Sequence, residues 1–322
     1  MLVLNTIEVS VKAGYRIHMG FYRFLDSPFT YGSLGAAIEI PQFTLTAKEC
    51  DKLSVEANSE YAKELIKNVS DYLGVRDVCI SLSGYVRHHV GLGSTTRIVM
   101  AALTAITTLK RMDVDIIDSA FKLGRGKVSS VGVYSFMYGN LVIDTGFRVD
   151  KSSSGRPKPL AIISIPRDWY VIVAIPEDKT GLKEDEENKI LRNVEVFHDQ
   201  GKLYRYVVML MTAAMHRDFN LFSESLRNIQ LLTGKYFSKY QGGIFCCDTS
   251  QDIIKIMEES GIRGIGQSSW GPAVYGFTNS YLKAVEVRNN IHNYLYRKGI
   301  KGKVWVTNVA QIGHKVDIML SS

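Results

Sequence analysis

Hydrophobic residues recur along the first third of the chain with two different periods, and each period predicts a different element. Residues 2–12 and 13–21 alternate between apolar and polar positions, as half-buried strands do. Residues 59–73 carry apolar side chains at helical spacing, and Gly74 closes that helix. Alternation returns at 78–85 and helical spacing at 95–110. This order of elements predicts an α+β fold rather than a doubly wound sheet.

The second half of the chain interleaves strands with helices. An uninterrupted apolar run at 169–176 predicts a buried strand, and residues 315–319 are expected to pair with a strand at 304–309. Helices are expected near 202–216, 219–233, 250–260 and 280–298, with a further strand at 273–277. Such a sheet is typical of a ferredoxin-like domain. The length of 322 residues predicts two domains, 1–165 and 166–322, with a mobile loop at 151–159 near their boundary.

Composition narrows the class of protein. Hydrophobic residues make up 46% of the chain and charged residues 22%, as in globular proteins. No run approaches the roughly 20 apolar residues of a membrane span, and no signal peptide is evident, so a cytoplasmic protein is expected. A net charge of +7 suits nucleic acid or small polyanions. Because the basic residues are spread along the chain, small anionic substrates are favoured.

The cysteines show no metal-binding pattern. Cys50, Cys79 and the adjacent pair Cys246 and Cys247 lack CxxC spacing, and nearby histidines complete no zinc motif. We therefore expect reduced, mostly buried thiols and no metal held by sulfur.

A glycine-rich stretch, Gly91-Leu92-Gly93-Ser94-Thr95-Thr96, lies between a predicted strand and a predicted helix. The glycines permit a tight turn, and the first amides of the helix have no internal acceptors and lie at the positive end of its dipole. Phosphate or carboxylate oxygens fit such a site. The hydroxyl groups add donors, and one of them can instead bind magnesium. A purely structural alternative is that Ser94 only caps the helix and the glycines only form the turn.

Other candidates lie on predicted strands. Arg16 and His18 are two residues apart, so both face the same side of a strand and suit an anionic ligand, unless they form a solvated basic edge. Asp144 ends an apolar strand, where it faces a ligand or magnesium or else caps the following turn. The acidic run at 184–187 precedes an amphipathic helix and is explained by the helix dipole without a metal site.

The segment Gly264-Ile265-Gly266-Gln267-Ser268-Ser269-Trp270-Gly271-Pro272 has more glycines than a plain turn needs. Gln, two Ser and Trp stand between these glycines. The pattern predicts a polar wall with one large aromatic side chain, and hence a role in binding.

Together these motifs resemble the GHMP kinase superfamily over essentially the whole chain, and more specifically the archaeal β-ribofuranosylaminobenzene 5'-phosphate synthase family of methanopterin-type cofactor biosynthesis. The resemblance rests on Arg16-Ile17-His18, His89 to Ser94, Gly124-Arg125-Gly126, Ile143-Asp144 and Gly266 to Pro272. The last is the most discriminating, because the kinases lack its Gln-Ser-Ser-Trp. The superfamily implies a ribosomal protein S5 domain 2-like first half, a ferredoxin-like second half, a site in the cleft between them and a homodimer.

The chain also departs from these families. Superfamily kinases typically place a carboxylate in the loop that corresponds to 127–132, and this loop has none. Its absence argues against ordinary kinase chemistry, although an acid can reach the site from elsewhere in the fold. Arg97 stands where the synthases would have glutamine, and Thr145 interrupts an expected Asp-Gly-Gly.

The resemblance implies a magnesium-dependent, decarboxylating phosphoribosyltransferase that couples 5-phosphoribosyl diphosphate to 4-hydroxybenzoate or 4-aminobenzoate. The alternatives are an ATP-dependent small-molecule kinase and a non-enzymatic RNA-binding protein. If the protein is the transferase, neither a nucleic acid nor a membrane is expected as a partner. The expected catalytic residues are Arg16, His18, His89, Arg125 and Asp144, with His88 a further proton acceptor. Phosphate is expected at Gly91, Leu92, Gly93, Ser94, Thr95, Thr96, Arg97 and Lys127, the acceptor at Gly266, Gln267, Ser268, Ser269 and Trp270, and Mg²⁺ at Ser94 and Asp144.

Overall fold

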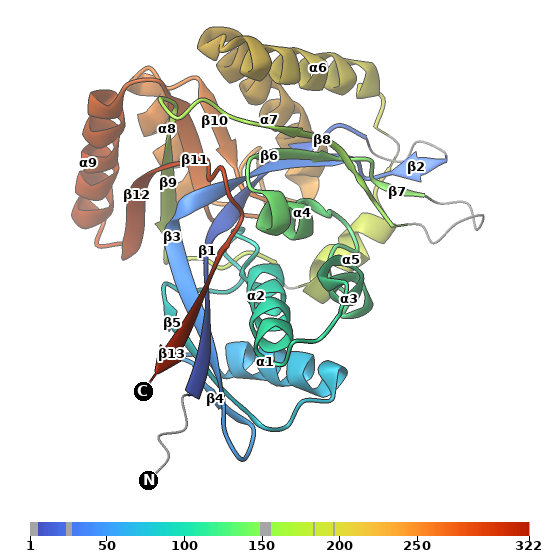
Figure 1. Ribbon diagram of the computed structural model, residues 1–322. Helices are drawn as coiled ribbons and strands as arrows, with labels where there is room; N and C mark the ends of the chain where they lie inside the picture. Colours follow the sequence, from blue (N-terminus) through green and yellow to red (C-terminus); the bar gives the residue numbers. More distant parts are fainter. Residues whose placement is uncertain (1–5, 24–27, 149–155, 183, 196, 322) are drawn as a thin grey trace.

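Two long antiparallel strands, β1 (Thr6–Phe21) and β3 (Ser33–Glu49), form the centre of the first sheet in the computed structural model (Figure 1). The structure describes residues 6–23, 28–148, 156–182, 184–195 and 197–321. β1 is one strand where the sequence predicted two extended pieces. The sheet order is β13 (Lys315–Ser321), β1, β3, β5 (Val78–Gly84), β4 (Ser54–Glu56), while β6 (Leu141–Asp144) pairs with both β3 and β8 (Pro159–Ile163).

Every second residue of β1 is apolar, so one face of the sheet is apolar. Helices cover this face and bury it. Helix α2 (Ser94–Leu109) packs on β1 and β3, and α1 (Glu60–Leu73) lies against α2. The helix α1 is the one predicted at 59–73: Ser59 caps its start and Gly74 its end. Two shorter helices follow, α3 (Ile116–Lys122) and α4 (Val131–Tyr138), and the small pair β2 (Phe29–Thr30) and β7 (Phe147–Arg148) lies apart.

The second sheet is antiparallel throughout, with the order β10 (Gly264–Gln267), β11 (Val274–Thr278), β9 (Tyr170–Pro176), β12 (Gly302–Asn308). Helices α8 (Asp248–Glu259) and α9 (Tyr281–Arg297) cover one face, where they bury Ile172 and Ala174. Val171, Val173 and Ile175 point to the opposite face and join the main core. Burial on both faces explains why this strand reads as an uninterrupted apolar run.

Three further helices complete the second half: α5 (Glu184–Arg192), α6 (Gln200–His216) and α7 (Phe219–Gln241). Helix α7 is longer than the helix predicted at 219–233, and it contacts both β10 of the second sheet and β1 of the first. It therefore links the two halves of the molecule at the place where the candidate site lies. In the described part of the chain, no helix combines the length and the apolar surface that crossing a bilayer requires.

The last strand corrects the predicted topology. β13 pairs with β1, with Val9 opposite Ile318, and not with β12, whose neighbour is β9. The chain reaches the first sheet through a bridge between Ile38 and Val309. An alternating pattern records which face of a strand is buried but not which strand lies beside it. The end of the segment 166–322 is thus part of the first sheet.

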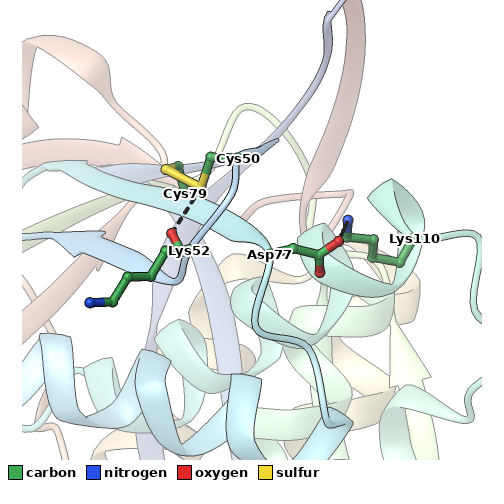
Figure 2. Close-up of a disulfide and its surroundings, with 5 residues drawn as sticks. All are labelled: Cys50, Lys52, Asp77, Cys79 and Lys110. Atoms are coloured by element: carbon green, nitrogen blue, oxygen red, sulfur yellow. Dashed lines mark hydrogen bonds and ion pairs between the residues drawn. A yellow bond between two sulfur atoms is a disulfide. The ribbon is translucent and has the colours of Figure 1, made fainter.

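A disulfide corrects the prediction of four reduced thiols. It joins Cys50, directly after β3, to Cys79 of β5 (Figure 2). The two cysteines are 29 positions apart in the sequence, and the pairing of β3 with β5 brings them together. The Lys110 ammonium lies nearby, 2.8 Å from the Asp77 carboxylate. Cys246 and Cys247 are free.

Candidate functional site

Two adjoining cavities lie between the glycine-rich stretch and the second half of the chain. The first, here called the anion cavity, encloses about 910 Å³, part of it open to solvent. It is lined mainly by polar and cationic residues: Arg16, His18, Phe21, His89, Gly91, Gly93, Ser94, Thr95, Thr96, Arg125, Gly126, Lys127, Val128, Ser129, Leu182, Glu187 and Ser269.

The second, here called the aromatic cavity, encloses about 430 Å³, part of it open to solvent. Its lining includes a row of neighbouring rings, because Phe21 lies 6.1 Å from Phe237 and Phe237 lies 4.9 Å from Trp270, centre to centre. Polar groups on the same lining come from Gln230, Thr233, Gln241 and Gln267. The two cavities share His18, Phe21, Glu187 and Ser269, so they are two parts of one site.

The start of helix α2 forms the floor of the anion cavity. Gly93 precedes the helix with a left-handed φ of 70°, and no side chain caps the first-turn amides. The purely structural reading, in which Ser94 is the cap, is therefore wrong. Gly91 also has a positive φ of 88°, and a Cβ there would lie 2.1 Å from the carbonyl oxygen of Ser268. Uncapped amides at the positive end of a helix are available to an anion.

Arg16 lies beside this turn. Its Nη1 donates a hydrogen bond to the Gly91 carbonyl over 2.5 Å, and its backbone amide donates to the Leu92 carbonyl. The Nε atom is buried without a partner. Burial lowers the pKa of Arg16 to about 10, against the opposing effect of the Glu187 carboxylate, so the guanidinium stays charged near neutral pH. Leu92 itself is buried and supplies only its backbone.

His18 occupies the junction of the two cavities, on the same side of β1 as Arg16. Its Nδ1 accepts a hydrogen bond from the Gly20 amide over 3.3 Å. Burial, together with the charge of Arg16, lowers the pKa of His18 to about 3. The ring is therefore neutral with its proton on Nε2, which is a potential hydrogen-bond donor. In this tautomer His18 offers a donor at Nε2, whereas the sequence led us to expect a proton acceptor.

Glu187 is the residue that the sequence analysis missed. Among the described residues that line the two cavities it carries the only carboxylate, and it belongs to α5. The favourable position of acidic residues at the start of a helix explains the run at 184–187 as a whole, but it does not single out Glu187. The signal that distinguishes Glu187 is its spacing, because Ile190 and the buried Leu191 follow three and four residues later and place it on the inward face of the helix.

The late glycine-rich segment is held rigidly against the glycine turn. The Ser268 hydroxyl donates to the Gly91 carbonyl over 2.6 Å and accepts from the His18 amide over 2.8 Å. The Gln267 side chain accepts from the Cys246 amide and donates to the Ser269 carbonyl. Ser268 and Gly266 thus support the wall, whereas Gln267, Ser269 and Trp270 line the aromatic cavity.

Asp144 does not lie in either cavity lining. It is fully buried, and its two carboxylate oxygens accept five hydrogen bonds from the amides of Ser33, Ser130 and Gly146 and the hydroxyls of Ser33 and Ser130. Burial raises its pKa, and the bonds from Ser33 and Ser130 oppose that rise. With both oxygens occupied, Asp144 is a positioning residue for the segment that precedes α4, and not the magnesium ligand or catalytic residue expected from the sequence.

Arg97 also lies away from the anion cavity. Its side chain is fully buried and donates to the Tyr15 carbonyl and to the Ser135 hydroxyl. Arg97 ends the first turn of α2 and points into the core, so the prediction that it binds phosphate is wrong.

The other predicted residues lie at or near the anion cavity. His88 is not part of the lining, and its Nδ1 lies 3.3 Å from the Ser94 hydroxyl. His89, Arg125 and Lys127 line the anion cavity.

The number of oxygen ligands in the anion cavity determines whether the protein alone could hold a magnesium ion. No group of three or more His, Cys, Asp or Glu side chains is poised to hold a metal among the described residues. The cavity lining offers the hydroxyls of Ser94, Thr95 and Thr96 and the Glu187 carboxylate. Magnesium commonly takes one or two protein oxygens together with substrate phosphates and water. The donor set therefore fits an ion that arrives bound to a diphosphate.

Sequence comparisons agree with this geometry. The model of the GHMP kinases N terminal domain matches residues 60–140, from α1 to the start of β6. A Methanocaldococcus jannaschii protein named beta-ribofuranosylphenol 5'-phosphate synthase is 27% identical over 336 residues, which cover 95% of this chain and 99% of that protein. Its Archaeoglobus fulgidus namesake is 29% identical over 303 residues, covering 89% and 92%. The chain is thus similar to this synthase over nearly its whole length, and to the GHMP kinase N-terminal domain over residues 60–140.

Solved structures show the same fold. Homoserine kinase from Cytophaga hutchinsonii superposes with a TM-score of 0.72 at 18% identity, over 98% of this chain and 99% of that one. Mevalonate diphosphate decarboxylase from Staphylococcus aureus gives 0.66 at 12% identity, over 98% and 100%. The predicted α+β, GHMP kinase-like fold is confirmed.

Proposed function

We propose that this protein is a member of the synthase family and a decarboxylating phosphoribosyltransferase that joins 5-phosphoribosyl diphosphate to 4-hydroxybenzoate and releases diphosphate and carbon dioxide. One observation carries the proposal: a cationic cavity over a helix N-terminus opens directly into a cavity lined by aromatic rings. The first suits a diphosphate and the second a benzoate ring. The relatives are named for a ribosylphenol product, which favours the hydroxy acid over 4-aminobenzoate.

The residues of the anion cavity have distinct roles in this proposal. The amides from Gly91 to Thr95 and the Ser94 hydroxyl hold the diphosphate, and Arg125 and Lys127 bind the 5-phosphate. Magnesium, when bound with the diphosphate, neutralises charge on the leaving group. Glu187 lies at the junction, where its carboxylate stabilises the positive charge that develops on the ribosyl carbon.

The reaction forms one carbon–carbon bond and breaks another. The ring carbon that bears the carboxylate attacks the ribosyl carbon while the bond to diphosphate breaks, and diphosphate keeps that electron pair. The bond to the carboxylate then breaks, carbon dioxide leaves, and its electron pair restores the aromatic ring. The para hydroxyl loses its proton to a water molecule or buffer base during the attack, and the phenolate is protonated again from solvent at the end. His18 and Phe21 are almost fully buried at the junction, so they exclude water from the reacting carbon.

A small-molecule kinase is the second candidate. The fold neighbours include kinases, and Glu187 supplies a carboxylate that the loop 127–132 lacks. A kinase requires room for a nucleotide and an acceptor hydroxyl near that acid. The homodimer and the cytoplasmic location belong to the proposal as implications of the family resemblance, and light scattering tests the dimer.

The test is one incubation with magnesium, 5-phosphoribosyl diphosphate and either benzoate, in which diphosphate and carbon dioxide are measured. A parallel incubation contains ATP and candidate alcohols. We expect equal amounts of diphosphate and carbon dioxide without ATP. Lys127→Gln should raise KM for the sugar diphosphate, whereas Lys122→Gln on the outer face of α3 should not. ATP turnover without diphosphate release from the sugar would favour the kinase.

A further inference from the structure

The aromatic cavity contains a buried hydroxyl group for which no residue described by the structure supplies a hydrogen-bond partner. Thr233, on α7, lines this cavity, and its Oγ1 atom is buried without a hydrogen-bond partner. A buried hydroxyl without a partner destabilises the folded protein, because it has lost its hydrogen bonds to water. Such a group inside a binding cavity is explained if a ligand supplies the missing partner.

Gly20 of β1, which has no side chain, lies close to this hydroxyl. A Cβ at Gly20 would lie 3.1 Å from Thr233 Oγ1 and 3.3 Å from Gln230 Nε2, and the φ of +110° also disfavours any other residue there. The Gln230 Oε1 atom already accepts a hydrogen bond from the Gln267 amide over 2.8 Å. The two side chains thus present one hydroxyl and one amide NH₂ group toward Gly20.

The opposite side of the aromatic cavity is its junction with the anion cavity. His18 stands there with a proton on Nε2, and Arg16 lies two residues before it on the same face of β1. A donor and a cation together suit a carboxylate. The rings of Phe21, Phe237 and Trp270 line the aromatic cavity, and Phe21 belongs to the junction as well.

We propose that the aromatic cavity binds a para-hydroxylated benzoate in one orientation, with its carboxylate at the junction near His18 and its para hydroxyl on Thr233. The orientation rests on the proposed function, because the ring carbon that bears the carboxylate must face the ribosyl carbon. The Oγ1 atom of Thr233 accepts a hydrogen bond from the para hydroxyl, and the Gln230 amide donates a hydrogen bond to the oxygen of that hydroxyl. An amino group offers a poorer acceptor to Gln230, so Thr233 and Gln230 determine specificity for the hydroxy acid.

The decisive variants are Thr233→Val, which removes the hydroxyl at nearly equal volume, and Thr233→Ser, which keeps it. Calorimetry measures the binding of 4-hydroxybenzoate and of unsubstituted benzoate in the presence of magnesium and diphosphate. Thr233→Val should weaken 4-hydroxybenzoate roughly tenfold, as expected for the loss of one hydrogen bond of about 1.4 kcal/mol. It should leave benzoate unchanged, and Thr233→Ser should bind both ligands as the wild type does.

The outcomes separate this inference from the proposed function. Equal effects of Thr233→Val on the two ligands, or no effect on either, would overturn the assignment even if the enzyme releases diphosphate. Selective loss of 4-hydroxybenzoate binding would support the assignment even if no diphosphate is released. Gly20→Ala provides a second variant: the added methyl group should weaken both ligands, and unchanged binding of both would contradict the placement of the ring beside Gly20. Thermal unfolding of each variant confirms that it is folded.

Discussion

The imidazole of His18 accepts a hydrogen bond at Nδ1 from the amide of Gly20, two residues farther along β1. This contact places the ring proton on Nε2, and burial keeps the ring neutral. An Arg and a His on one face of a strand suggested a base beside a cation. The structure instead presents a fixed donor beside a cation.

Two substitutions distinguish a donor from a base at position 18. The amide nitrogen of glutamine lies near the place of Nε2, and the amide oxygen of asparagine lies near the place of Nδ1. His18→Gln should keep kcat within about tenfold of the wild type, whereas His18→Asn should lose roughly a hundredfold, in line with the loss of one preorganised donor. Steady-state kinetics of both variants measure this. A general base at His18 would instead make both variants equally inactive.

Buried neutral histidines should make the protein sensitive to acid. Burial lowers the pKa of His18 to about 3 and that of His88 to about 4, while both have ordinary values near 6.5 in the unfolded chain. Between these values the unfolded chain binds more protons than the folded one, so stability falls as pH decreases below 6.5, by about 1.4 kcal/mol per pH unit for a fully buried histidine. Urea unfolding from pH 7 to pH 4.5 should show a shallower decline for His18→Gln. Parallel pH curves for the two proteins would refute the neutral state of His18.

Glu187 should contribute to the rate and not to the fold. It lines both cavities from α5 as their only carboxylate among the described lining residues. Glu187→Gln should lower kcat by roughly 10- to 100-fold, because an amide stabilises a developing positive charge less well than a carboxylate. Asp185→Asn, an exposed neighbour, is the matched control and should behave as the wild type. Equal kcat values for Glu187→Gln and the control would remove Glu187 from the reaction.

Asp144 should contribute to the fold and not to magnesium binding. In Asp144→Asn an NH₂ group must face donors from Ser33, Ser130 or Gly146, which should destabilise the protein by about 2–4 kcal/mol. Chemical denaturation measures that loss. The magnesium concentration for half-maximal rate should not change in the fraction that remains folded. A stable variant that requires more magnesium would restore Asp144 as a ligand.

The disulfide between Cys50 and Cys79 should stabilise the first sheet. A cross-link over 29 positions restricts the unfolded chain and is worth about 3–4 kcal/mol on the loop-entropy model. Reduction, or a Cys50→Ala, Cys79→Ala double substitution, should therefore lower the denaturation midpoint without changing KM, because neither residue lines the anion cavity or the aromatic cavity. Disulfides are uncommon in the cytosol. Mass spectrometry of protein alkylated directly on cell lysis shows whether the bond forms there.

Much of the local structure could be predicted because it depends on neighbouring residues. The helix spacing of 59–73 gave α1 with its glycine cap, and the glycines before Ser94 gave a turn with free amides. Arg16 and His18 share one face, as residues two apart on a strand must. The synthase resemblance was visible in short motifs for the same reason, since those motifs form the turn and the wall of the site.

The remaining features depend on contacts that no local pattern records. Asp144 and Arg97 have the chemistry of ligand-binding residues, yet five donors surround the first and the protein core surrounds the second. The spacing of Glu187 to Ile190 and Leu191 marks the inward face of α5, but only the packing of α5 shows that this face meets the cavities.

The sequence by itself determined most of the helices and strands, the uncapped amides at the start of α2 and the resemblance to the synthases, because spacing and backbone chemistry act over a few residues. Only the tertiary structure decided the neighbour of β13, the link between Cys50 and Cys79, the tautomer of His18 and the unpaired hydroxyl of Thr233. Each of these depends on a partner brought near by the packing of separate elements, and the free energy of such contacts is set by burial and geometry rather than by residue type.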